Sequence, residues 1–254
     1  MITLAFGVQF LLLLIGPAAI GFWFTQRLKL TWRLFFGGAL AFVASWIITN
    51  FIPLPWQLGY LVSAILQTIA LYLVYRFQLG TVNTEREALM VGLGQGGVEL
   101  ILIGLLAALS FMQMLPLRDV SDQRLIELTA SWQDISEEKV DAQEVNDLRD
   151  LIEEYWDTPW YVPLLQSLQY LVALPIQIIL AIVVLRAWVQ SILSPLLAAM
   201  AIDFFYRVLT IYAFILGGSL IGLIVSLFFG GAALWYLSQL WPTIQEQTKS
   251  ASPA

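Results

Sequence analysis

The sequence contains no cysteine and no histidine, and it carries few charges. Without cysteine, the chain can form neither a disulfide nor a thiolate metal site. Without histidine, it lacks the commonest protein ligand for zinc and the commonest general base near neutral pH. Only 12% of its 254 residues are charged, whereas a soluble domain carries about a quarter. These absences exclude thiol- and imidazole-based chemistry and argue against a soluble protein.

Long apolar runs fill most of the chain, and 59% of its residues are hydrophobic. A membrane-spanning helix needs roughly 20 apolar residues. We therefore expect an all-α, polytopic transmembrane helix bundle of about seven spans, forming a single domain over residues 1–254 and located in the cell membrane. The first span should be a retained helix, because residues 1–25 lack the basic start and the cleavage site of a signal peptide. The predicted spans are 3–24, 34–54, 57–76, 88–115, 161–186, 190–213 and 217–240.

The basic residues of the short connections predict how the bundle is oriented. Cytoplasmic loops carry an excess of lysine and arginine. Placing the N-terminus outside and the C-terminus inside leaves Arg207 as the one basic residue among the short outer connections. The basic residues on the inner side are then Arg27, Lys29, Arg33, Arg76, Arg86, Arg186 and Lys249.

Residues 116–160 form an acidic segment between two spans. From Arg118 to Asp157 the sequence has 13 acidic and 4 basic residues. Apolar residues recur at helical spacing, which predicts two short amphipathic helices over the outer face, the second capped by Ser136. The segment is either a solvated acidic loop, the simpler interpretation, or a surface that attracts a cationic partner. A nucleic-acid partner is not expected without a basic patch.

The fourth span contains a glycine-rich run that ends in an acid, Gly92-Leu-Gly-Gln-Gly-Gly-Val-Glu99. A phosphate-binding loop would need a preceding strand and a following lysine, and neither is present. Inside a membrane helix, glycines instead indicate close helix packing. Glu99 lies about 18 Å deep at about 1.5 Å per residue, and an acid at that depth is a functional candidate. The glycines expected to pack against other helices are Gly92, Gly94, Gly96 and Gly97.

This run resembles the motif Gly-x-Gly-His-Gly-Gly-x-Glu of the YhfC family of intramembrane metalloproteases, relatives of the CAAX-processing and bacteriocin-protection proteases. Gln95 stands at the histidine position, and Glu99 is kept. The Gly-Gly-Ala-Leu-Ala-Phe run at residues 37–42 and the position of the long loop add to the resemblance. It implies the helical fold of the family and a site built from acids and histidines.

At most of the site positions implied by the resemblance, this sequence departs from the family pattern. A Glu-Glu pair in the preceding span is replaced by Gln67 and Thr68, and an arginine three residues later by Leu71. After the long loop, a Glu-Arg pair and a histidine are replaced by Gln169, Tyr170 and Gln177. The last family histidine falls near Ile202 or Asp203. The chain resembles a family member whose catalytic residues have been lost.

Counting residues from the predicted inner ends of the spans places several amides at similar depth. At about 1.5 Å per residue, Gln67 lies about 14 Å deep, Gln95 about 12 Å and Gln177 about 14 Å. We expect these side chains either to face one another or a small wet cavity, or to act as separate contacts between helices. Asp203 has a simple expected partner, because Arg207 is four residues further on and can form an ion pair near the outer interface.

Three functions therefore compete. The first is a non-catalytic homologue, without cofactor or metal, that binds membrane lipid, a transmembrane helix or the other subunits of a membrane complex. The second is a small transporter or channel that uses Glu99. The third is an active protease with a relocated site, which would need at least three metal ligands converging near Glu99.

Overall fold

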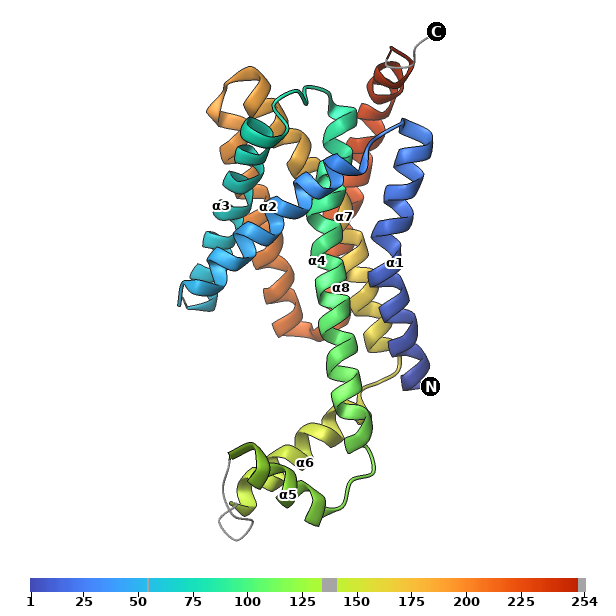
Figure 1. Cartoon of the computed structure of the whole chain (residues 1–254), viewed down its shortest axis with the longest axis vertical. Coiled ribbons are helices and arrows are strands. Elements are labelled where there is room, and N and C mark those ends of the chain that lie inside the picture. Colours follow the sequence, from blue (N-terminus) through green and yellow to red (C-terminus); the bar gives the residue numbers. More distant parts are fainter. Residues whose placement is uncertain (54, 134–140, 251–254) are drawn as a thin grey trace.

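The computed structural model describes residues 1–53, 55–133 and 141–250, and these residues form helices without any β-strand (Figure 1). This confirms the all-α helix bundle expected from the sequence. The α-helices are α1 (Ile2–Leu28), α2 (Trp32–Phe51), α3 (Trp56–Leu73), α4 (Glu85–Met114), α5 (Asp122–Gln133), α6 (Ala142–Asp157), α7 (Tyr161–Gln190) and α8 (Leu193–Ser250). A π-helical turn, η1 (Val74–Gln78), continues α3, and a 3₁₀ turn, η2 (Leu115–Leu117), follows α4.

Six helical segments of the described chain are long and apolar enough to cross a membrane, and the last of them, α8, is bent back on itself. A straight helix of 58 residues would be about 87 Å long, far more than a bilayer core of about 30 Å. The helix is interrupted at Gly217 and Gly218, where Gly218 has a φ of 69° that residues with a Cβ atom rarely adopt. Its two halves run in opposite directions (Figure 1). They correspond to the predicted spans 190–213 and 217–240.

The two ends of the bundle differ in what they carry. The N-terminus and the pair α5 and α6 lie at one end, and the C-terminus lies at the other (Figure 1). The connections from α1 to α2 and from η1 to α4 lie at the C-terminal end (Figure 1). Which end faces the cytoplasm remains a prediction from the distribution of basic residues.

Helix α4 is the centre of the bundle. It contacts α1, α2 and α7, and all ten residues from Ala88 to Gly97 are buried. A helix that is buried all round has no polar face to present to water or lipid. Polar groups on this stretch, such as Gln95, must therefore find partners inside the protein.

The acidic segment folds into two helices with a small core of their own. Leu125 of α5 packs with Val145 and Ile152 of α6. The N-cap of α6 is Asp141, whose side chain accepts a hydrogen bond of 2.9 Å from the Gln143 amide. Ser136 was the cap predicted for this helix. Ser136 lies outside the described residues.

Candidate functional site

Two glycines of α4 allow α7 to approach at backbone distance. A Cβ atom at Gly92 would lie 2.5 Å from the Cα atom of Ile178, a separation that real Cβ atoms do not show. A Cβ atom at Gly96 would lie 2.9 Å from the side chain of Gln177. Gly92 and Gly96 therefore form the face of α4 that packs against α7, and this contact places Gln177 next to α4.

The other two glycines of the run face α2 and α1. A Cβ atom at Gly94 would lie 1.9 Å from the carbonyl oxygen of Phe35 in α2, and one at Gly97 would lie 3.0 Å from Pro17 in α1. Because the glycines alternate between two faces of α4, this helix packs closely against α7 on one face and against α1 and α2 on the other. The polar side chains of Gln95 and Glu99 are thereby held inside the bundle.

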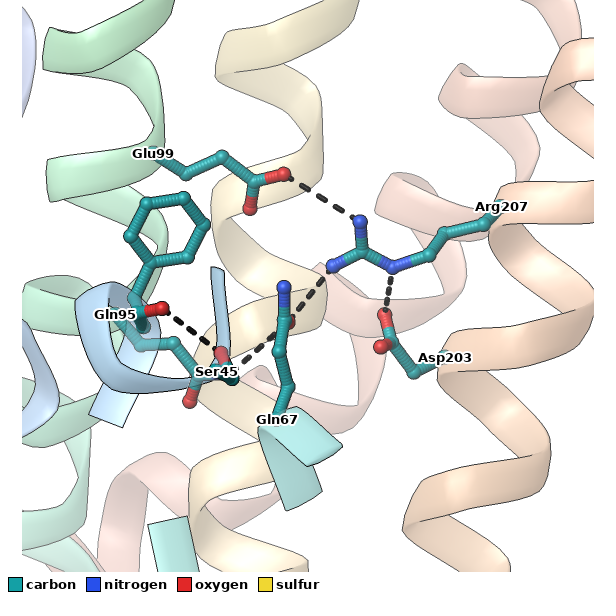
Figure 2. A network of polar contacts seen from close by, with 7 residues as sticks. Ser45, Gln67, Gln95, Glu99, Asp203 and Arg207 are labelled. Atoms are coloured by element: carbon teal, nitrogen blue, oxygen red, sulfur yellow. Dashed lines mark hydrogen bonds and ion pairs between the residues drawn. The ribbon is translucent and has the colours of Figure 1, made fainter. Parts of the chain in front are cut away.

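Arg207 of α8 is the centre of a polar cluster that joins three helices (Figure 2). Its Nε atom donates a hydrogen bond of 3.0 Å to Oδ1 of Asp203, one turn away on the same helix. Its Nη2 atom donates a hydrogen bond of 2.8 Å to Oε1 of Gln67 in α3. Its Nη1 atom lies 3.5 Å from Oε1 of Glu99 in α4 and forms an ion pair with it. The planar guanidinium thus uses all three of its nitrogens to hold α3, α4 and α8 together.

The cluster continues through an amide pair to the glycine-rich run. The Nε2 atom of Gln95 donates a hydrogen bond of 3.4 Å to Oε1 of Gln67, which also accepts from Arg207. Thr68, beside Gln67, donates its hydroxyl to the carbonyl oxygen of Ala64 at 2.8 Å. Gln67, Thr68 and Gln95 are all buried, so these are interior contacts.

A cavity of about 270 Å³ lies beside the cluster. Since each water molecule in the liquid takes about 30 Å³, the cavity could hold several water molecules or a small polar group. Glu99 and Arg207 reach its wall, with 23% and 15% of their side chains exposed, whereas Asp203 is closed off at 1%. The residues that line the cavity are Tyr60, Glu99, Leu100, Ile103, Gln169, Tyr170, Ala173, Gln177, Tyr206, Arg207, Thr210 and Ile211.

Several buried polar atoms in and around the cavity have no hydrogen-bond partner. Oε1 of Gln177 and the hydroxyl of Thr210 belong to residues that line the cavity and are more than nine-tenths buried. Oε1 of Gln95 and Oδ2 of Asp203, within the cluster, are also buried without a hydrogen-bond partner. Buried polar groups normally find a partner, so oxygen atoms left over beside a cavity point to a polar occupant.

The structure brings together some of the residues singled out in the sequence and separates others. Gln67 and Gln95 meet and share the cluster with Glu99, whereas Gln169 and Gln177 lie on the wall of the cavity. Gln177 therefore does not join the amide pair but faces the same space as Glu99.

The prediction for Arg207 was wrong in its position. The predicted ion pair with Asp203 is confirmed at 3.0 Å. Arg207 was also counted among the short outer connections, but it lies inside the helix bundle and contacts Glu99 and Gln67 as well. The sequence contained a signal that could have identified it, because an acid and a base one turn apart within an apolar span are costly unless they face the interior. Tyr206 and Thr210, on the same helix, were also not predicted to line the site.

The residues present do not fit a catalytic metal ion. Within the described part of the chain, no group of three or more acidic, histidine or cysteine side chains converges. A catalytic zinc ion takes three protein ligands. Glu99 and Asp203 are already paired with Arg207, and the nearby amides are weak ligands that cannot act as a base near neutral pH.

In a comparison with protein families, residues 56–221 match the family described as YhfC intramembrane metalloprotease. The matched region extends from the start of α3 to just beyond the break in α8, so it contains every residue of the polar cluster. No curated protein and no solved structure matches the chain.

Proposed function

Because the chain belongs to the YhfC intramembrane metalloprotease family, we propose that it is a non-catalytic member that binds a ligand or partner in its intramembrane cavity. The observation that carries this proposal is the position of Arg207. Its guanidinium pairs with both acids of the cluster, where a metal-dependent protease would need free ligands. A fixed cation at this point satisfies the two carboxylates and repels a divalent metal ion.

The polar groups around the cavity suggest what kind of group it binds. Arg207 is the main donor, and its three nitrogens are already directed at Asp203, Glu99 and Gln67. Acceptors are left over, among them Oε1 of Gln177. Two carboxylates also face one guanidinium, so the cluster carries one excess negative charge when both acids are ionised. We infer that the ligand presents hydrogen-bond donors, such as an ammonium group or the free amides of an unwound transmembrane segment.

A role as an accessory subunit of a membrane complex fits this chemistry. A binding module without a reaction of its own acts through a partner, and a partner helix could bring donors to the cavity from within the bilayer. The direct test is purification of the native complex from its own membrane with a mild detergent. Recovery of a defined membrane partner with the wild-type chain, and its loss with Gln177→Leu, is the expected result.

The absence of catalysis is tested on the purified protein by metal analysis and by a protease assay with transmembrane peptides. We expect less than stoichiometric zinc and no cleavage. Stoichiometric zinc, or cleavage that is abolished by Glu99→Gln, would overturn the proposal. Arg124→Gln is a matched control, because Arg124 forms an exposed ion pair with Glu127 in α5, remote from the cavity.

A second candidate is a transporter for protons or small cations. It is favoured by the position of Glu99, whose carboxylate both reaches the cavity and contacts Arg207, so that protonation would weaken that ion pair. It predicts an ion flux in liposomes that Glu99→Gln abolishes. Binding of a partner without any flux would leave the first function as the explanation of the cavity.

A further inference from the structure

A second polar cavity is lined by residues of two connections between helices. These connections lie at the C-terminal end of the bundle (Figure 1). The cavity has a volume of about 200 Å³ and lies between the connection from α1 to α2 and the connection from η1 to α4. Three cations line it, Lys29, Arg33 and Arg86, against one acid, Glu87. The hydroxyl residues Thr31 and Thr81 line it as well.

Arg86 is the residue whose charge is not satisfied. Its Nε and Nη1 atoms are buried and have no hydrogen-bond partner. Neither of the two acids beside it in the sequence forms an ion pair with it, although Oε2 of Glu85 is also buried without a partner. Glu85 accepts a hydrogen bond of 2.9 Å from Arg186, and Glu87 accepts one of 2.7 Å from the hydroxyl of Thr84 in the capping box of α4. Arg86 is half-buried as a residue, but buried donor atoms without an acceptor are costly, so its unused Nε and Nη1 donors indicate a missing anion.

A neighbouring cavity extends the basic surface toward the rim of the bundle. It has a volume of about 540 Å³, shares Lys29 with the first, and is also lined by Arg27 and Lys249 without any acid. Two tryptophans line it, Trp23 of α1 and Trp241 of α8, with ring centroids 6.1 Å apart. Tryptophan is enriched at the interface between membrane and water, so this basic surface lies at the level of the lipid headgroups.

We propose that the cavity at Arg86 binds the phosphate of an anionic phospholipid headgroup. Basic pockets between the ends of spanning helices are suited to such headgroups. The adjoining basic surface with Trp23 and Trp241 favours a lipid over a free anion, because these rings place the site at the level of the lipid headgroups. This site is separate from the cavity at Glu99 and does not depend on the function proposed for it.

The test is native mass spectrometry of the purified full chain in detergent, titrated with phosphatidylglycerol or with zwitterionic phosphatidylcholine. We expect phosphatidylglycerol to bind more tightly. Arg86→Gln should weaken its binding about fivefold, because one cation near an anionic lipid contributes about that much. Arg33→Gln, which removes an exposed cation from the same cavity, should weaken it as well. Arg124→Gln, at the other end of the molecule, should leave it unchanged.

Equal binding of the two lipids, or unchanged phosphatidylglycerol binding in both Arg86→Gln and Arg33→Gln, would overturn the proposal. Inorganic phosphate in millimolar excess separates a lipid site from a site for a free anion. If phosphate binds with Arg86 dependence while phosphatidylglycerol does not, the lipid assignment is wrong. If Arg86→Gln does not fold, the test uses two other measurements. Arg33→Gln should weaken phosphatidylglycerol binding, and high salt should remove the preference for phosphatidylglycerol, because salt screens the attraction of the headgroup.

Discussion

The Nη1 atom of Arg207 lies 3.5 Å from Oε1 of Glu99, and this ion pair joins the last spanning helix to the central one. The same guanidinium holds Asp203, whose side chain is only 1% exposed. A buried carboxylate without a partner is strongly unfavourable. Arg207 is therefore expected to matter for stability before it matters for any activity.

Arg207→Met should lower the free energy of unfolding by about 3 kcal/mol, because it leaves Asp203 buried and unpaired. Thermal unfolding of the purified protein in detergent measures this loss. Adding Asp203→Asn to Arg207→Met should recover part of the stability, because the double variant no longer buries an isolated charge. A double variant that is less stable than the sum of the single changes would contradict the assignment of Asp203 as a buried anion.

Glu99→Gln should cost much less stability than Arg207→Met. Glu99 reaches the cavity, the amide can still accept a hydrogen bond from Arg207, and Arg207 keeps Asp203 and Gln67. We expect a loss of about 1 kcal/mol or less, in the range of a single hydrogen bond. Thermal unfolding of both variants side by side gives the comparison, and a loss for Glu99→Gln equal to that for Arg207→Met would show that the two charges act as one unit.

The chemistry of the polar layer could be predicted from the sequence more readily than its geometry. Counting residues along the predicted spans placed Gln67 and Gln95 at similar depth, and the structure brings them within 3.4 Å of each other. The count could not show that Gln177 turns toward the cavity, because depth in the bilayer does not determine which way a helix face points. Arg207 lay within the predicted span 190–213 but was counted with the outer connections, because a basic residue near the end of a span was taken to reach the interface.

The fold was predicted more fully, because long apolar runs determine spanning helices almost by themselves. The reversal of α8 was predicted, but the gap between the two predicted spans, residues 214–216, lies just before the break at Gly217 and Gly218. The chain remains helical on both sides of the break and has no separate loop there. Asp141 caps α6, and the local sequence does not decide between it and Ser136, since both are acceptable caps.

Gly94→Ala should destabilise the bundle by at least about 2 kcal/mol, since overpacking an interior typically costs about 1–3 kcal/mol and here the new methyl group would meet backbone. The clash is with the carbonyl oxygen of Phe35, 1.9 Å away, and can be relieved only by moving α2 away from α4. Gly231→Ala is the matched control, because a Cβ atom there has nothing within 4 Å. Thermal unfolding should separate the two variants, and equal stability would mean that α2 and α4 do not pack this closely.

Gly218→Ala should lower stability by about 1–3 kcal/mol, because a φ of 69° with a ψ of −167° lies in a backbone region that is adopted almost only by glycine. The space around Gly218 is open, so the loss of stability comes from its backbone conformation, with a φ of 69°, and not from a clash. Gly218→Asn should cost about as much, because asparagine tolerates the left-handed helical region at a ψ of about +47° and not a ψ of −167°. If both variants unfold like the wild type, the reversal of α8 does not need the glycine.

The proposed competition between Arg207 and a metal ion can be tested by restoring ligands. Gln67→Glu and Gln95→His place an acid and an imidazole where the amide groups now lie 3.4 Å apart, with Glu99 held to the same guanidinium. With Arg207 present, these two changes should not give stoichiometric zinc, because the guanidinium already pairs with the carboxylates. Adding Arg207→Met should raise the zinc affinity at least about tenfold, since three ligands are then free to converge. Zinc content measured after dialysis checks this, with Arg124→Met in place of Arg207→Met as the control. Equal zinc binding with and without Arg207 would show that the guanidinium does not exclude the metal ion.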